Sequence, residues 1–151
     1  MTDPVVKTIR VKCSADHAFD VFVNRTSSWW PLDGHAVSAS KGKAALAVTI
    51  EPRVGGAVYE TMYDGTRTDW GEVLEYEPGS KIAMTWHPGA NADTPTRVDV
   101  AFAVLGDEQT EVTLTHSGWE ILGDDADDRR NGYNGGWDNV FGNFYANACT
   151  A

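Results

Sequence analysis

Residues 137–148 read WDNVFGNFYANA, with apolar side chains at the spacing of one face of an α-helix. The face is made by Trp137, Val140, Phe141, Phe144, Tyr145 and Ala148. Four aromatic side chains on one face can bury a large area. The pattern therefore predicts a helix near the C-terminus, with Trp137, Phe141 and Phe144 buried against a sheet.

The same face continues towards the N-terminus through Tyr133 and Arg130. We therefore expect the helix to begin just after Gly123, with Asp124 or Asp125 as its N-cap. Four glycines interrupt the stretch, and each costs about 1 kcal/mol relative to alanine inside a helix. Because glycine lets another backbone come close, we expect a long, glycine-interrupted helix that lies in a concave partner.

The rest of the chain is dominated by short runs of alternating residues that predict β-strands. These runs are Val5–Val11, Ala45–Glu51, Ala57–Tyr63, Thr68–Tyr76, Lys81–Trp86, Thr96–Val104 and Glu111–His116. After the first run, Ser14 is a suitable N-cap for a helix, and a second short helix is expected to end at Trp30, before Pro31. Residues 32–44 are small and polar and predict a loop. Short turns between the later runs indicate antiparallel pairing.

These elements define the expected fold class as α+β. A curved antiparallel sheet of about seven strands would wrap around the long C-terminal helix, with two short helices after the first strand. At 151 residues, the chain is expected to form a single domain over residues 1–151.

The formal net charge of −10 is unevenly distributed along the chain. Residues 1–53 hold seven basic and five acidic residues, a sum of +2, whereas residues 54–151 hold five and seventeen, a sum of −12. Nucleic acid and anionic membranes are therefore poor partners, and we expect a monomer or a weak homodimer. No apolar run approaches the length of a membrane span, and the N-terminus lacks the apolar core of a signal peptide, so we expect a cytoplasmic protein.

Sequence motifs for nucleotide binding, nucleophilic catalysis and metal binding are absent, so no cofactor and no metal are expected. Cys13 and Cys149 belong to no paired motif and are interpreted as reduced structural thiols. The acidic residues around Asp124 are most simply the solvated start of the helix, with a metal site as the alternative.

Four segments resemble one protein family. They are EPRVGGAVYE (51–60), WGEVLEYEPGSKIAMTW (70–86), TEVTLTHSGWE (110–120) and GGW (135–137). They resemble the Hsp90-ATPase-activator-homologue-1-like family of the START-like (SRPBCC) helix-grip superfamily. The resemblance implies a seven-stranded antiparallel sheet around a C-terminal helix, with a cavity between them. It also implies a choice of functions, since the superfamily includes lipid carriers, hormone receptors and polyketide cyclases, and the eukaryotic cochaperone that named the family.

His116 is the first candidate for chemistry in such a cavity. On its strand, Val112, Leu114 and His116 share the face that points towards the helix. Because the unperturbed pKa of histidine is near neutrality, His116 could act as a base or bind a ligand. The alternative is a core histidine that bonds to a backbone carbonyl.

Glu60 and Glu72 are the second candidates, because alternation places both on apolar strand faces. If both carboxylates point inward, they form an acid–base group with His116. The alternative is that a β-bulge reverses the alternation and places Tyr59, Thr61 and Tyr63 inside instead. Arg130 on the helix face could be the counter-charge of these carboxylates or could lie at the mouth of the cavity.

Aromatic side chains would line any space between sheet and helix. The predicted ligand-binding set is Trp70, Trp86, His116, Arg130, Tyr133, Trp137 and Phe141. The first hypothesis is a protein that binds a small apolar or aromatic ligand in this space. The second is a cofactor-independent cyclase or hydrolase that uses His116 with Glu60 or Glu72. The third is a cochaperone-like interaction domain.

Overall fold

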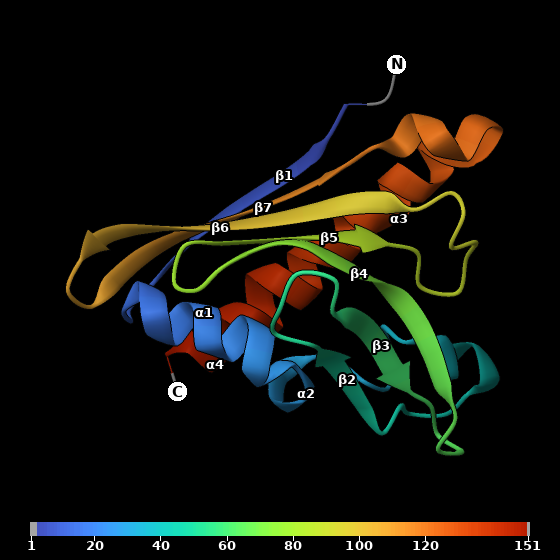
Figure 1. The fold of residues 1–151 in the computed structure, drawn as a ribbon, viewed down its shortest axis with the longest axis horizontal. Coiled ribbons are helices and arrows are strands. Elements are labelled where there is room, and N and C mark those ends of the chain that lie inside the picture. Colours follow the sequence, from blue (N-terminus) through green and yellow to red (C-terminus); the bar gives the residue numbers. More distant parts are fainter. Residues whose placement is uncertain (1–2, 151) are drawn as a thin grey trace.

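The computed structural model describes residues 3–150, in which the strands form a seven-stranded antiparallel sheet (Figure 1). The strands are β1 (Val5–Val11), β2 (Ala47–Ile50), β3 (Ala57–Thr61), β4 (Arg67–Glu77), β5 (Lys81–Trp86), β6 (Thr96–Gly106) and β7 (Gln109–Ser117). Their order in the sheet is β1-β7-β6-β5-β4-β3-β2. Strands β2 to β7 thus pair with their neighbours in the sequence, and β1 joins the sheet beside β7. The predicted antiparallel order is confirmed.

The helical segments follow β1 and β7, as the sequence predicts. They are α1 (Ala15–Asn24), α2 (Thr26–Trp29), the 3₁₀ helices η1 (Val37–Lys41) and η2 (Trp119–Asp125), α3 (Ala126–Asn139), the π-helix η3 (Val140–Tyr145) and α4 (Ala146–Cys149). The sheet curls around α3, η3 and α4, with α1 beside them, so the α+β helix-grip architecture is confirmed (Figure 1). Within residues 3–150, no helix is both long and apolar enough to cross a membrane.

Both predicted helix starts lie close to their predicted positions. Ser14 caps α1, because its Oγ accepts a hydrogen bond from the His17 N–H at 3.1 Å. Before α3 the chain kinks at Gly123, whose φ of 61° suits glycine. Asp125 then occupies the N-cap position of α3, but its side chain makes no capping hydrogen bond.

The buried face of the C-terminal helices matches the predicted pattern except at Phe144. Trp137, Phe141 and Tyr145 are at most 2% exposed, whereas Phe144 is 43% exposed, so the prediction that Phe144 is buried is wrong. The cause is the π-helix η3, which the α-helical spacing did not anticipate. Because a π-helix bonds residue i to i+5, each residue rotates the chain by less than the about 100° of an α-helix. Tyr145 therefore stays on the buried face, and Phe144 turns away from it.

Strand β4 contains two bulges that change which side chains face the helix. The pairing with β3 skips Trp70, and the pairing with β5 skips Leu74. Trp70 and Val73 are consequently buried and Tyr76 packs on the core, whereas Glu72 is exposed. Of the two orientations that the sequence left open, the inward one is therefore wrong for Glu72, because each bulge shifts the alternation of β4 by one residue.

Gly71 makes the first bulge possible. A Cβ atom at this position would lie 1.8 Å from the backbone oxygen of Thr85 on β5. The close approach also lets the Glu72 N–H donate a hydrogen bond to Thr85 Oγ1 at 2.8 Å. The bulge is thus fixed by a glycine that no other residue can replace without moving β5.

Aromatic packing fills the concave face of the sheet near α1. Phe19 and Phe22 of α1 contact Phe102 of β6 with ring centroids 5.3 and 6.4 Å apart. The Phe22 ring also contacts Tyr145, whose hydroxyl donates to the Ala18 carbonyl at 2.7 Å. Cys13 and Cys149 are free, buried thiols near this core, and burial raises the pKa of each. The concave face is therefore packed solid here, and open space lies further along, beside α3.

Candidate functional site

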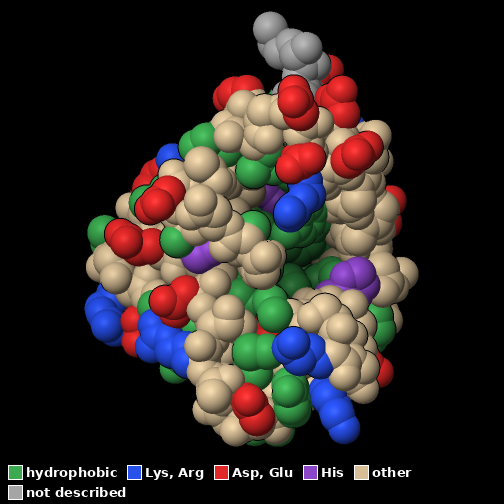
Figure 2. All heavy atoms as spheres, turned by 90° about the vertical axis from the view of Figure 1, so that its right-hand side faces the viewer, with side chains coloured by type: hydrophobic (Ala, Val, Ile, Leu, Met, Phe, Trp, Pro, Cys, Tyr) green, Lys and Arg blue, Asp and Glu red, His purple; other side chains and the backbone are tan. Residues whose placement is uncertain are grey.

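An open pocket of about 400 Å³ lies between α3 and the concave face of the sheet. Figure 2 shows it as a hollow lined with hydrophobic side chains, and charged side chains lie around it. Its walls include Trp70 on β4, Trp86 on β5 and residues of the segment from Trp30 to Ser40. The C-terminal helical segments contribute four residues, which are Tyr133, Gly136, Trp137 and Val140. Three parts of the chain that are distant in sequence therefore meet at one site.

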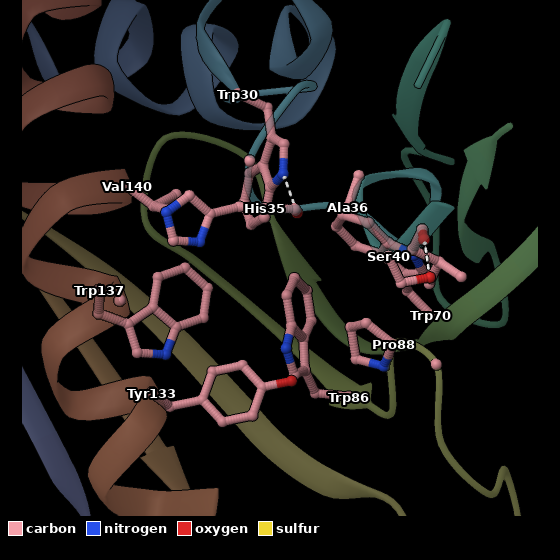
Figure 3. Close-up of a pocket in the computed structure, with 14 residues that line it drawn as sticks. Trp30, His35, Ala36, Ser40, Trp70, Trp86, Pro88, Tyr133, Trp137 and Val140 are labelled. Atoms are coloured by element: carbon pink, nitrogen blue, oxygen red, sulfur yellow. Dashed lines mark hydrogen bonds between the residues drawn. The ribbon is translucent and has the colours of Figure 1, made fainter. Parts of the chain in front are cut away.

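Four tryptophans form a continuous cluster around the pocket (Figure 3). Trp86 contacts Trp70 and Trp137 at centroid distances of 5.5 Å, and Trp30 contacts all three others at 5.2 to 6.0 Å. The Tyr133 ring stacks on Trp137 at 6.3 Å. Since tilted and edge-on contacts hold indole rings in fixed orientations, the walls of the pocket are rigid aromatic surfaces.

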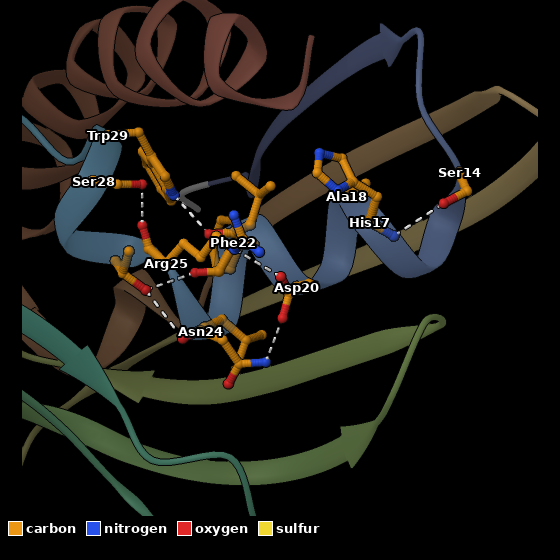
Figure 4. Close-up of polar contacts among 12 residues, drawn as sticks. Ser14, His17, Ala18, Asp20, Phe22, Asn24, Arg25, Ser28 and Trp29 are labelled. Atoms are coloured by element: carbon orange, nitrogen blue, oxygen red, sulfur yellow. Dashed lines mark hydrogen bonds and ion pairs between the residues drawn. The ribbon is translucent and has the colours of Figure 1, made fainter. Parts of the chain in front are cut away.

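The end of α2 separates Trp29 from Trp30. The Trp29 indole N–H donates to the Val21 carbonyl at 2.8 Å, which holds this ring on α1 (Figure 4). Pro31 disfavours helical backbone at Trp30, which adopts a ψ of 132°. Trp30 thereby reaches the pocket, where its indole N–H donates to the His35 carbonyl at 2.7 Å.

The indole N–H of Trp86 differs from the others. All six tryptophans lie in the described part of the chain, and five donate to a protein acceptor: Trp29, Trp30, Trp70, Trp119 and Trp137. Trp86 Nε1 is buried and makes no hydrogen bond of good geometry within residues 3–150. An unsatisfied buried donor costs about 1–3 kcal/mol, so this pocket contains a polar group in need of an acceptor.

His116 lies behind the pocket wall and is fully buried. Its Nδ1 accepts a hydrogen bond from the Trp137 indole N–H at 3.0 Å, and its Nε2 lies 2.6 Å from Thr96 Oγ1. Because the Thr96 hydroxyl donates to the Trp86 carbonyl at 2.9 Å, Nε2 must donate to Thr96. The imidazole is therefore the neutral Nε2–H tautomer, and burial lowers its pKa to about 3.

Glu60 is also fully buried, but in a different environment. Its carboxylate accepts hydrogen bonds from the N–H groups of Val37 and Ser38 at 2.7 and 2.9 Å and from Ser38 Oγ at 2.7 Å. A fourth comes from the Trp70 indole at 3.2 Å. Glu60 thus caps the N-terminus of η1 and fixes the pocket wall to β3 and β4.

The predicted acid–base group is not assembled in the described structure. His116 hydrogen-bonds to Trp137 and Thr96, Glu60 bonds to the start of η1, and Glu72 is exposed on the outer face of β4. Sequence alternation correctly placed His116 and Glu60 inside. It could not show that both are held by other partners.

The seven predicted ligand-binding residues occupy three kinds of position. Trp70, Trp86, Tyr133 and Trp137 line the pocket. His116 is behind the wall, and Phe141 is a core residue whose ring stacks on Tyr145 at 5.5 Å. Arg130 is outside the pocket, because its guanidinium donates to the carbonyls of Asp3 and Pro4. No group of three or more His, Cys, Asp or Glu side chains in residues 3–150 is placed to hold a metal.

The sequence interpretation missed the wall formed by Trp30, His35 and the residues up to Ser40, which was predicted only as a loop. His35 lies above Gly136, where a Cβ would be 3.8 Å from its Cε1, and its Nε2 is 3.4 Å from Asn139 Nδ2. The residue that could have indicated this wall is Trp30, a large aromatic residue that directly precedes a segment of small and polar residues.

Comparisons with known proteins agree with the fold. A model of the family described as "Activator of Hsp90 ATPase homolog 1-like protein" matches residues 12–147. The structure is similar to that of the anthrahydroquino-γ-pyrone synthase Txn09 complexed with SUM, with 31% sequence identity and a TM-score of 0.67, covering 97% of this chain and 96% of that chain. A search of curated proteins gives no match.

Two further structures show a likeness of fold alone. The self-sacrificing resistance protein CalC from Micromonospora echinospora is 22% identical, with a TM-score of 0.71 and coverage of 97% of this chain and 94% of that chain. An HSP90 activator from Plasmodium falciparum is 20% identical, with a TM-score of 0.62 and coverage of 93% and 92%.

Proposed function

The chain belongs to the family of activator of Hsp90 ATPase homolog 1-like proteins, and we propose that it binds a small, flat aromatic molecule in the pocket beside α3. The observation that supports this most is the cluster of four tryptophans around a pocket of about 400 Å³. Pockets of roughly 300–1,000 Å³ with mostly apolar walls are typical of small-molecule sites.

The chemistry of the walls favours a flat ligand over an aliphatic chain. None of the described lining residues is Asp, Glu, Lys or Arg, so a highly charged ligand would lose its hydration without gaining a partner. The rings of Trp30, Trp70, Trp86 and Trp137 offer faces and edges that stack on planar rings. A flexible chain would gain burial of area but no stacking.

Two adjacent glycines on α3 provide the test. Gly136 lines the pocket, whereas Gly135 is exposed and has open space around it. Gly136→Leu should fill the pocket, and Gly135→Leu carries the same change in helix propensity outside it. In equilibrium dialysis, we expect the three-ring hydrocarbon fluorene to bind the natural protein and Gly135→Leu with similar affinity, and to lose at least tenfold in affinity in Gly136→Leu. Equal binding by both variants would refute this site.

A second candidate function is a cofactor-independent ring closure on such a ligand. The 31% identity to a γ-pyrone synthase favours it. Within the described pocket, His35 and Tyr133 are the lining side chains suited to moving a proton. The test is an ortho-hydroxyaryl 1,3-diketone, in which the phenol oxygen attacks the distal ketone and water leaves to give a γ-pyrone. Mass spectrometry would detect the loss of water, and a rate equal to that in buffer would exclude this activity.

A further inference from the structure

The free indole N–H of Trp86 suggests how the pocket recognises its ligand. Trp86 is 5% exposed and lines the pocket, yet its Nε1 makes no hydrogen bond of good geometry in the described part of the chain. Every other indole N–H of the protein has one. A buried donor of this kind is rare in folded proteins, so its acceptor is expected from outside the chain.

The phenol of Tyr133 is next to this donor (Figure 3). Burial raises the pKa of Tyr133, and a hydrogen-bonding contact with the Trp86 indole, too poor in geometry to satisfy its N–H, and the Arg129 charge only partly offset this. The phenol therefore keeps its proton at neutral pH and can donate it to an acceptor. Trp86 and Tyr133 thus present an N–H and an O–H to the same region of the pocket.

Two acceptors of the protein around this pair are already occupied, one of them on His116, whose ring contacts Tyr133 at a centroid distance of 4.7 Å. The Trp86 carbonyl accepts from Thr96, and His116 Nδ1 accepts from Trp137. No carboxylate is among the described lining residues. A water molecule at this point would meet mostly aromatic carbon, whereas a buried water usually makes about three hydrogen bonds.

We infer that Trp86 Nε1–H and the Tyr133 hydroxyl together hold an oxygen atom on the edge of the flat ligand, so that the preferred ligands are fused-ring ketones, quinones or phenols rather than hydrocarbons. This inference rests on the proposed binding function. In this arrangement the aromatic walls provide the affinity for the rings of the ligand. The two donors select ligands that carry an oxygen on the edge over those that do not.

Fluorene and 9-fluorenone provide a matched pair of probes, because they differ by one carbonyl oxygen on the same flat skeleton. We expect the natural protein to bind fluorenone about tenfold more tightly than fluorene. Trp86→Phe and Tyr133→Phe keep an aromatic ring and remove one donor, so each should reduce the preference for fluorenone over fluorene to about twofold or less; Trp86→Phe should also weaken fluorene itself, as Trp30→Phe does, because the phenyl ring is smaller than the indole. Trp30→Phe is the control, because its N–H is already bonded to His35; it should weaken both probes equally.

Indole N–H resonances provide a readout that does not depend on the stability of the variants. Each of the six tryptophans contributes one indole N–H signal to a ¹⁵N NMR spectrum, and the signal missing in Trp86→Phe would identify Trp86. Fluorenone should shift this signal downfield, and fluorene should not. If fluorene itself does not bind, the proposed function fails. If fluorene and fluorenone bind equally and the Trp86 signal shifts with neither, or if only Tyr133→Phe removes the preference, the paired anchor is refuted and the aromatic pocket remains.

Discussion

The indole N–H of Trp137 donates to Nδ1 of His116 at 3.0 Å. An indole N–H can only donate, so the contact requires an unprotonated Nδ1. The contact joins α3 to β7 behind the pocket and keeps the imidazole neutral. His116 therefore acts as a support for the pocket wall, and protonation of its ring opposes the folded state.

The pH dependence of stability follows from this contact. The pKa of His116 falls from 6.5 in the unfolded chain to about 3 in the folded protein. The unfolded state then binds one more proton below pH 6.5, so this contribution is complete above pH 6.5 and is lost as the pH falls towards 3. In urea unfolding we expect His116 to account for a loss of about 2 kcal/mol between about pH 7 and pH 5.

His116→Gln should remove that loss, because glutamine can accept from Trp137 and donate to Thr96 without titrating. His17→Gln on α1 should retain it. A His116→Gln protein whose stability declines over this range as steeply as the natural protein would contradict the assignment.

Trp137 and Phe144 come from the same predicted helix face but should respond differently to truncation. Trp137 is 2% exposed, so Trp137→Ala should cost about 3–5 kcal/mol in free energy of unfolding. Phe144 is 43% exposed, so Phe144→Ala should cost less than about 1 kcal/mol. Chemical denaturation measures both. Similar costs would mean that η3 is an ordinary α-helical turn.

Glu60 and Glu72 form a second matched pair. Glu60→Gln places an amide NH₂ against donors at the start of η1 and should cost about 2–3 kcal/mol. It should also weaken fluorene binding, since η1 belongs to the pocket wall. Glu72→Gln changes an exposed side chain and should alter stability by less than about 0.5 kcal/mol. Equal effects of the two changes would be evidence that Glu60 is not buried.

Gly71 should be the most sensitive glycine of the sheet. Gly71→Ala puts a Cβ where Thr85 O lies 1.8 Å away, so β5 has to move and the protein should lose about 3 kcal/mol or more. Gly132→Ala on α3 meets nothing within 4 Å and should stabilise by up to about 1 kcal/mol. Thermal unfolding of the two variants would show shifts of opposite sign; a neutral Gly71→Ala would disprove the bulge.

The charge of −12 over residues 54–151 bears on self-association. Repulsion between like-charged surfaces should oppose a dimer at low salt and weaken as added salt screens it. We therefore expect sedimentation to show a monomer or a weak dimer that strengthens with salt. A tight dimer that is insensitive to salt would contradict this expectation.

The periodic parts of the sequence predicted the fold well. Alternating runs gave the strands, and the spacing of Trp137, Phe141 and Tyr145 gave the helix that the sheet surrounds. The orientations of Glu72 and Phe144 differ from the simple periodic pattern for one physical reason. A β-bulge and a π-helical turn each change the number of residues per structural repeat, and the amino-acid composition does not reveal either of them.

The site was less predictable than the fold. Three pocket tryptophans and Tyr133 were predicted from their faces on regular elements. Trp30 and His35 lie on irregular backbone, where no periodicity predicts the direction of a side chain. The free Trp86 N–H was beyond reach of the sequence too, since hydrogen-bond satisfaction depends on all neighbours in space.

The pairing of β1 with β7 also sets the order in which the protein can fold. Contacts across this pair, such as Thr8 with Thr113, join residues 105 positions apart, whereas each other neighbouring pair of strands is a local hairpin. During synthesis, β1 emerges first and must wait until β7 is made. Once β7 has formed, and until β1 docks on it, β7 is an open sheet edge that can pair with another chain. Slow closure of this long loop is therefore expected to limit the folding rate, and the nascent protein should be most prone to aggregation just before β1 docks.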